Sequence, residues 1–274
     1  MEENLLFTRT FIILGGMLLL TTITSRLNEA YETNIEFFVT TTGTFLSLFA
    51  IYVLGDQFPA NIIAVGVFSL FIGWALGPTI AAIGEAYKFK KYLKGKLVIS
   101  KKLGHGKYKE IVYYYKSEPD KTFSRYSDEF MRLTLEFEKN VLPHDRYNRE
   151  WQNIIFQALL GTTFAVFVTA TVVLFTDQDF GFLEPVLFIC LLALIVMELL
   201  NFFIFKSSRR RLILAYAGVI LFTFYLVFDF NRLEKAIARG DESWSTAIDL
   251  AVNIYLDLIN IFVDLLRILA AASE

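Results

Sequence analysis

The sequence predicts an all-α membrane protein: a seven-transmembrane-helix bundle with its last helix at the centre, and a small soluble α+β insert between helices 3 and 4. The first observation behind this prediction is composition, because 55% of the 274 residues are hydrophobic and the mean hydropathy is +0.50. Such a chain is too apolar for an ordinary soluble domain. The second observation is a set of seven apolar segments, and the third is a stripe of polar residues along the last of them.

Each of the seven segments reaches the roughly 17–25 residues that cross the hydrocarbon core of a bilayer. Pro185 falls in the first turn of the fifth segment, where proline is tolerated. Pro78 lies inside the third segment, in Gly73-Trp-Ala-Leu-Gly-Pro78, and indicates a kink or a close helix contact. The predicted spans are residues 6–25, 36–54, 60–83, 152–176, 182–205, 211–230 and 246–270.

The chain therefore divides into helices 1–3 in residues 1–86, a hydrophilic insert in residues 87–150, and helices 4–7 in residues 151–274. The insert is basic, with 16 Lys and Arg against 9 Asp and Glu, a net charge of +7 in a chain whose total is −2. Within the insert we predict two strands joined by a turn at Gly104-His105-Gly106, followed by one helix. The strands are Lys96–Ser100 and Glu110–Tyr115, and the helix is Ser127–Lys139.

Basic residues also predict the orientation of the chain, because loops rich in Lys and Arg stay in the cytoplasm. They place the insert and the C-terminus inside and the N-terminus outside. The N-terminus has neither a basic region nor a small-residue cleavage site, so we expect the first segment to be retained. The lack of a cleavable signal favours a bacterial plasma membrane or a mitochondrial inner membrane over the endoplasmic reticulum.

Several kinds of chemistry are excluded by residue type. Cys190 is the single cysteine, and the two histidines, His105 and His144, are far apart, so the sequence has no cysteine or histidine metal motif. The Gly-x-Gly-Asp motif of intramembrane aspartyl proteases is absent at both Asp229 and Asp257. We therefore expect no enzyme activity, no cofactor and no nucleic-acid partner.

The last segment carries the strongest functional signal. Its five polar residues fall within roughly 80° of the helix circumference at about 100° per residue. A charge at mid-bilayer costs at least about 2.5 kcal/mol, so this stripe must face a protein interior or a wet cavity. We predict that the stripe lines a path for cations and that the helix carrying it is central. The stripe consists of Asp249, Asn253, Asp257, Asn260 and Asp264.

Asp229 stands about one turn from the end of the sixth span, and Asp257 lies about halfway along the seventh. If these spans are antiparallel neighbours, the two carboxyls meet, and they then either share a proton or hold a cation between them. Carboxylate oxygens are ligands that suit Ca²⁺. Two alternatives remain open: each Asp caps a half-helix or bonds a neighbouring Thr. Asp264 is either a second binding position along the cation path or an ion-pair partner of Arg267.

These segments resemble the transmembrane Bax inhibitor motif family. The similarity covers about residues 1–86 and 150–270, and it is most specific after residue 212. The matching motifs are Phe228-Asp-Phe-Asn-Arg-Leu233, Asn253-Ile-Tyr-Leu-Asp-Leu-Ile-Asn-Ile-Phe262 with Leu265-Leu-Arg-Ile-Leu269, Gly73-Trp-Ala-Leu-Gly-Pro78 and Ala158-Leu-Leu-Gly-Thr-Thr-Phe164.

The resemblance implies a seven-helix bundle and a pH-sensitive Ca²⁺ leak, in which Asp229 and Asp257 take the role of the family's di-aspartyl sensor of protons and Ca²⁺. The chain departs from the family in two ways. The insert of residues 87–150 is not part of the family's compact plan. In the family, the second helix can carry a basic residue that pairs with the two aspartates. The second span of this chain, residues 36–54, has no Lys or Arg.

Two functions follow as hypotheses. The first is a pH-sensitive Ca²⁺ leak channel or proton-coupled Ca²⁺ exchanger, in which Asp229 and Asp257 sense or bind the ion and Asp249, Asn253, Asn260 and Asp264 line its path. The second is a non-transporting structural or regulatory subunit of a larger membrane complex, such as a membrane protease or respiratory assembly. In that case the basic insert, residues 87–150, would contact the protein partner.

Overall fold

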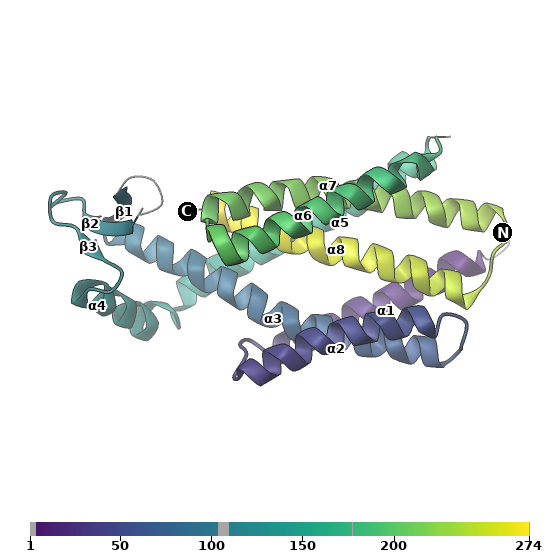
Figure 1. Ribbon diagram of the computed structural model, residues 1–274, viewed down its shortest axis with the longest axis horizontal. Helices are drawn as coiled ribbons and strands as arrows, with labels where there is room; N and C mark the ends of the chain where they lie inside the picture. Colours follow the sequence, from purple (N-terminus) through teal and green to yellow (C-terminus); the bar gives the residue numbers. More distant parts are fainter. Residues whose placement is uncertain (1–3, 104–109, 177, 274) are drawn as a thin grey trace. The chain divides into compact units, whose positions relative to one another are not determined.

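The computed structural model describes residues 4–103, 110–176 and 178–273. The chain is predominantly helical, with one small antiparallel sheet (Figure 1). It divides into two compact units: a helical unit of residues 1–81 and 158–268, and a second unit of residues 82–157 and 269–274. The predicted turn at Gly104-His105-Gly106 lies outside the described residues.

Six helices are long and apolar enough to cross a membrane, judged by length and composition over the described residues. The chain is thus an integral, multi-pass membrane protein. The six spans are contributed by α1 (Leu5–Leu27), α2 (Asn34–Val53), α3 (Ala60–Gly95), α5 (Asp145–Leu174), α6 (Glu184–Leu200) with its π-helical continuation Asn201–Phe205, and α7 (Ser208–Ala238). The sequence predicts a seventh span at residues 246–270; that segment forms the helix α8 (Trp244–Ala272), which is not one of the six.

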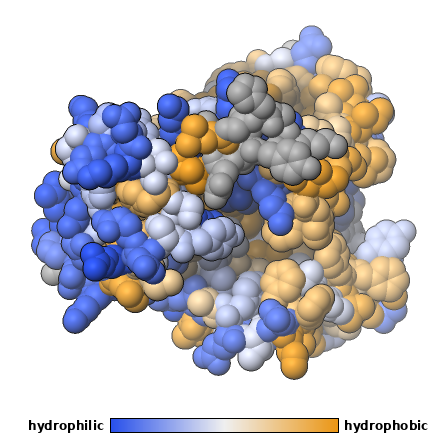
Figure 2. Space-filling model, turned by 60° about the vertical axis from the view of Figure 1, so that its left-hand side comes forward, coloured by the Kyte–Doolittle hydropathy of each residue, from blue (hydrophilic) through white to orange (hydrophobic). Residues whose placement is uncertain are grey.

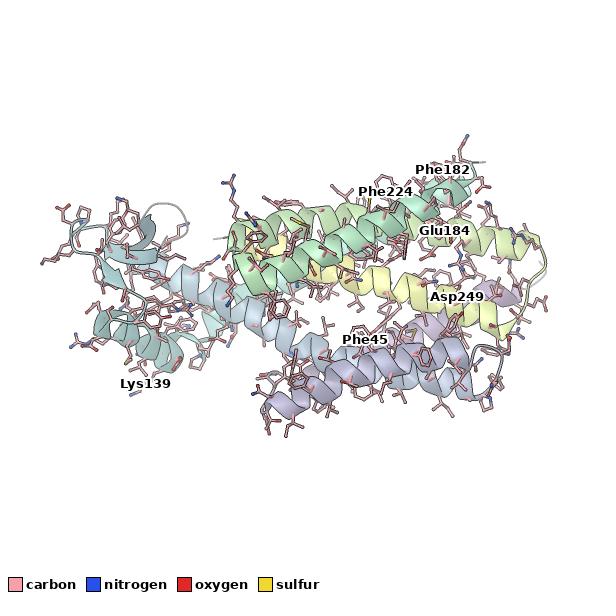
Figure 3. The ribbon with its side chains drawn as sticks, viewed as in Figure 1. Phe45, Lys139, Phe182, Glu184, Phe224 and Asp249 are labelled. Atoms are coloured by element: carbon pink, nitrogen blue, oxygen red, sulfur yellow. The ribbon has the colours of Figure 1, made fainter. Side chains whose placement is uncertain are left out.

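The outer surface of the helical unit is apolar. Phe45 of α2, Phe164 of α5 and Phe188 of α6 are all exposed, at 69%, 70% and 57% of their surface. Figure 2 shows hydrophobic residues gathered over a broad part of the surface, and Figure 3 shows side chains such as Phe224 projecting from the helices. Large apolar side chains at this density are typical of a lipid-facing surface, so these helices contact the bilayer.

The interior of the helical unit is organised along α8. Among the described residues, half of the twelve largest fully buried side chains belong to this helix, including Ile248, Ile254, Tyr255 and Ile261. The Tyr255 hydroxyl hydrogen-bonds with the Thr21 hydroxyl of α1 at 2.5 Å, and its ring packs edge-on against Phe68 of α3. Figure 1 shows α8 running between α6 and α7 on one side and α1 and α3 on the other.

Small residues allow α3 to approach α1 closely. A Cβ atom on Gly73 would lie 1.8 Å from the Thr24 hydroxyl and 2.6 Å from the Thr21 carbonyl oxygen. The Asn28 side chain also donates to the Trp74 carbonyl at 3.0 Å. Pro78 lies inside the unbroken helix α3. Of the two expectations for the Gly73–Pro78 segment, the structure therefore has the close helix contact.

The second unit contains the sheet and α4 (Asp128–Glu136). Strands β1 (Val98–Leu103), β2 (Glu110–Tyr115) and β3 (Phe123–Ser124) pair in that order, with Val98 opposite Tyr115. Ser127 caps α4 by accepting a hydrogen bond from the Phe130 backbone N–H, as serine favours at this position. A separate apolar cluster joins Tyr92, Val98, Leu133 and Phe137.

The structure corrects three details of the insert. The first strand begins at Val98 rather than Lys96 and extends to Leu103, because α3 continues to Gly95 before the chain turns. A third strand, β3, was not predicted. The predicted helix 127–139 ends as α-helix at Glu136 and continues as a π-helical turn over Phe137–Val141.

Candidate functional site

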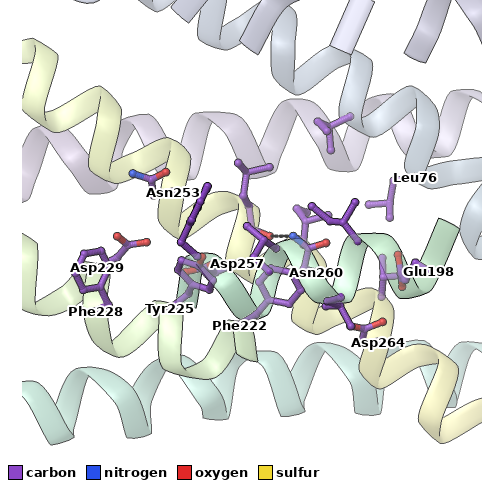
Figure 4. A pocket seen from close by; sticks show the side chains of 18 of the residues that line it. Leu76, Glu198, Phe222, Tyr225, Phe228, Asp229, Asn253, Asp257, Asn260 and Asp264 are labelled. Carbon is purple, nitrogen blue, oxygen red and sulfur yellow. Dashed lines mark hydrogen bonds between the residues drawn. The ribbon is translucent and has the colours of Figure 1, made fainter. Parts of the chain in front are cut away.

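A cavity of about 940 Å³ lies inside the helical unit, lined by residues of α3, α6, α7 and α8 (Figure 4). The α8 residues that line it extend from Asn253 to Arg267. At 1.5 Å rise per residue this length is about 21 Å, against about 30 Å for the hydrocarbon core of a bilayer. The polar lining comprises Asp229 and Arg232 of α7, Glu184 and Glu198 of α6, Thr79 of α3, and Asn253, Asp257, Asn260, Asp264 and Arg267 of α8.

Asp229 and Asp257 both line this cavity and are both buried, at 2% and 5% of their surface. Asp229 belongs to α7 and Asp257 to α8, so these two helices bring both carboxyls to one cavity. The Asp257 Oδ2 atom is buried without a hydrogen-bond partner in the described part of the chain. A buried carboxyl oxygen without a partner destabilises the fold, so a proton or a cation bound at this atom would be stabilising.

Arg232 balances the charge of Asp229. Its guanidinium lies 3.4 Å from the Asp229 carboxylate, one turn away on α7, and 2.6 Å from the Asp249 carboxylate on α8. We call these three residues the Arg232 triad. Asp249 is exposed, accepts a further hydrogen bond from the Asn253 amide at 3.3 Å, and is not among the cavity-lining residues. Figure 3 shows Asp249 and Glu184 toward the same end of these helices.

Asn253 and Asn260 line the cavity on either side of Asp257. The Asn260 side-chain nitrogen donates to the Leu256 carbonyl at 2.8 Å, and its side-chain oxygen takes no part in that bond. Four of the five residues of the predicted stripe thus share one cavity, and Figure 4 shows them in sequence along it, from Asn253 beside Asp229 to Asp264 beside Glu198.

A second arginine lies at the Glu198 end of the cavity. Arg267 is 2.9 Å from the Asp264 carboxylate on its own helix and 3.5 Å from the Glu198 carboxylate on α6. We call these three residues the Arg267 triad. The Glu198 carboxylate of α6 thus pairs with an arginine of α8.

Acidic loop residues lie at the other end of the same helices. The Asp179 carboxylate accepts hydrogen bonds from Lys235 and from the Gly181 backbone N–H, and these hold its pKa below the usual value. The Thr246 hydroxyl and the Ser243 backbone N–H do the same for the pKa of Asp241. Both loop carboxylates therefore stay ionised at neutral pH.

Within the described residues, no group of three or more His, Cys, Asp or Glu side chains is arranged to hold a metal ion. Four of the five carboxyls along the cavity form two sets, Asp229 with Asp257 and Asp264 with Glu198, and each set has an arginine beside it. Such an arrangement suits an ion that keeps some of its water, because Ca²⁺ takes six to eight oxygen ligands and two carboxyls supply only part of them.

Comparison with known proteins places this site in a family. Residues 147–274 match the family described as inhibitor of apoptosis-promoting Bax1. This part of the chain belongs to the Bax inhibitor family. The match includes α5 to α8 and hence every cavity residue except those of α3.

Individual proteins are also similar to this chain. An uncharacterised protein of Campylobacter jejuni is 39% identical over 121 residues, which are 44% of this chain and 49% of that protein. Protein LIFEGUARD 4 of Arabidopsis thaliana is 34% identical over 124 residues, 44% of this chain and 48% of that protein. An uncharacterised membrane protein of Streptococcus pyogenes is 29% identical, over 43% of this chain and 52% of its own. The chain spans about half the length of the curated relatives it matches.

Sequence reasoning missed Arg232 of the Bax inhibitor region as part of the site, whereas it offered Arg267 as one of two alternatives for Asp264. Arg232 lies three residues after Asp229, and Arg267 three residues after Asp264. Because side chains three apart are neighbours on a helix, this repeated spacing was a signal that could have placed each arginine beside its carboxyl. The contributions of α3 and α6 had no such signal, since they depend on tertiary packing.

Proposed function

We propose that this chain is a pH-sensitive cation pathway, a Ca²⁺ leak channel or proton-coupled Ca²⁺ exchanger, with Asp229 and Asp257 as its proton and ion sensor. One observation carries the proposal: the Asp257 Oδ2 atom is buried without a partner in a cavity that it shares with Asp229. Resemblance to the Bax inhibitor motif family, whose di-aspartyl pair senses protons and Ca²⁺, supports the same assignment.

In this proposal α8 is the seventh transmembrane helix and the centre of the bundle. Its contacts with α1, α3, α6 and α7 support a central place. Its polar stripe is then solvated by the cavity rather than exposed to lipid, where each charge would be costly.

The mechanism follows from the charge on the pair. Two carboxyls in a low-dielectric interior do not comfortably ionise together, so at low pH they share a proton and hydrogen-bond, which holds α7 against α8. When that proton leaves, the carboxylates repel one another unless a cation binds between them. Arg232 already neutralises Asp229, so Asp257 is the group at which the proton and the cation exchange.

Ca²⁺ flux into liposomes that hold the purified protein, measured at pH 6, 7 and 8, tests this function. We expect flux to rise with pH, by at most roughly tenfold per pH unit, the limit for one titrating proton. Asp257→Asn and Asp229→Asn should each abolish that pH dependence. Asp56→Asn, in the loop between α2 and α3, is the control and should behave as the wild type. No flux above empty liposomes from folded protein would refute the proposal.

A second candidate is a non-transporting subunit of a larger membrane complex. The observation that favours it is the extent of the family match, which begins at residue 147 and so leaves out nearly all of the basic insert, residues 87–150. A partner that co-purifies with the full chain and is lost when residues 98–141 are deleted would support this function. Ca²⁺ flux that survives the same deletion would separate transport from docking.

A further inference from the structure

The two ends of the cavity have the same construction. At one end Arg232 lies between Asp229 and Asp249, and at the other Arg267 lies between Asp264 and Glu198. At each end one carboxylate is buried, Asp229 at 2% and Asp264 at 5% exposure. The other carboxylate is more exposed: side-chain exposure is 55% for Asp249 and 48% for Glu198. Each arginine therefore links a buried carboxylate to a solvated one.

The Arg267 triad joins two helices across the cavity. Asp264 and Arg267 belong to α8, whereas Glu198 belongs to α6. The Arg267 side chain retains 27% of its exposure, so its guanidinium is partly hydrated. Partial hydration weakens an ion pair, so the guanidinium is a component of the triad that another cation can replace.

Oxygen atoms lead from the unpartnered carboxyl of Asp257 to this triad. Asp264 lies seven residues beyond Asp257, about 10 Å along the helix, and Asn260 lies between them and also lines the cavity. The buried Asp257 Oδ2 atom has no hydrogen-bond partner in the described part of the chain, and Asp257 lines the same cavity as the triad. Figure 4 shows this order of side chains.

The neighbouring helix leaves space for the Asp264 carboxylate. Gly218 of α7 faces it so closely that a Cβ atom at position 218 would lie 2.0 Å from Asp264 Oδ2. A glycine here lets a carboxylate stay buried against α7 and oriented toward Arg267. The packing therefore holds Asp264 as a ligand in a fixed place, while Arg267 is the exchangeable component.

We propose that Asp264, Glu198 and the Asn260 side-chain oxygen form a second cation site, which the Arg267 guanidinium occupies when no metal ion is present. This inference rests on the proposed transport function. A Ca²⁺ ion leaving Asp257 reaches Asp264 and Glu198 and displaces Arg267 toward solvent. The exchange is favourable because the ion brings two charges to two carboxylates, and carboxylate, amide and water oxygens are its preferred ligands.

Variants of Arg267 test the second site by flux in liposomes. Arg267→Gln should increase Ca²⁺ flux about two- to fivefold, the factor that corresponds to loss of a partly exposed ion pair. Asp264→Asn should decrease it, because the buried ligand is lost. Arg209→Gln removes a basic residue at the start of α7 that is outside the cavity lining, and it should match the wild type.

Flux that changes in Asp257→Asn but not in Arg267→Gln or Asp264→Asn would overturn the second site and leave the proposed function intact. If the wild type gives no flux, the proposed function fails, and the second site is then decided by binding. The measurement is the shift of the thermal unfolding midpoint on adding Ca²⁺ in detergent. A larger shift in Arg267→Gln than in the wild type, lost in the Arg267→Gln, Asp264→Asn double variant, supports the site. Equal shifts in all three contradict it.

Discussion

Asp229 and Asp257 show that neighbouring residues of one type take different roles when their surroundings differ. Both are buried in one cavity, yet Arg232 pairs with Asp229, and no Lys or Arg in the described part of the chain pairs with Asp257. An uncompensated charge in the interior costs several kcal/mol. Asp257 is consequently the group whose state changes with pH or with a bound ion.

Tyr255 anchors α8 to α1, and its replacement gives the first residue-scale prediction. Tyr255→Phe removes the hydrogen bond to Thr21 but leaves the ring against Phe68. We expect a loss of about 1 kcal/mol in unfolding free energy, seen as a lower thermal unfolding midpoint in detergent. Tyr52→Phe, at a residue 86% exposed, should leave the midpoint unchanged. An equal effect of both substitutions would contradict the anchor role.

Gly73 gives a second residue-scale prediction. A Cβ atom there would meet the backbone of α1 at Thr21 as well as the Thr24 hydroxyl, and a backbone cannot move aside cheaply. Gly73→Ala should therefore cost about 1–3 kcal/mol, the usual range for overpacking. Gly15→Ala is the matched control on α1, because nothing lies within 4 Å of its Cβ position. A thermal unfolding midpoint that falls no further for Gly73→Ala than for Gly15→Ala would refute the close contact.

At the residue scale the sequence predicted which α8 side chains share a face, but not how their charges are balanced. A period of about 100° per residue is enough to group Asn253, Asp257, Asn260 and Asp264. The balance depends on tertiary neighbours: Glu198 is 69 residues from Arg267 in the chain and pairs with it only because α6 packs beside α8. No local pattern carries that information.

At the scale of elements, hydropathy located the helices well and their ends less well. The predicted third span stops at residue 83, shortly before Glu85 and Lys88, yet α3 continues to Gly95. Charged residues end a membrane span without ending a helix, because Lys is a good helix former. Strand β3 has two residues, too few for an alternating pattern to be visible. The sequence predicted α8 as a helix, and the structure has one there. By length and composition, six other helices qualify as membrane spans.

The insert provides the prediction at this scale. Phe137 is 2% exposed and packs against Phe89 and Tyr92 in the apolar cluster of the second unit. Phe137→Ala should destabilise that unit by about 3–5 kcal/mol, so amide hydrogens of β1, β2 and α4 should exchange faster. Leu135→Ala, at a neighbouring residue 59% exposed, is the control. Unchanged exchange in Phe137→Ala would show that the cluster does not hold the insert together.

At the scale of the whole molecule, the two units have separate apolar clusters. All residues lining the cavity belong to the helical unit. We therefore expect Phe137→Ala to retain the Ca²⁺ flux of the wild type, because its effect is confined to a unit that contributes nothing to the cavity. A loss of flux in this variant, with the helical unit still folded, would assign the insert a direct part in transport.

The central claim is that the Asp229–Asp257 pair exchanges a proton for a cation, and infrared difference spectroscopy on Ca²⁺ addition tests it most directly. In the wild type at pH 6, we predict that Ca²⁺ removes the carbonyl stretch of one protonated carboxylic acid. The signal should be absent in Asp257→Asn and present in Asp56→Asn. A wild type without this signal, or an equal signal in Asp257→Asn, would contradict the claim and leave the buried pair as a structural contact between α7 and α8.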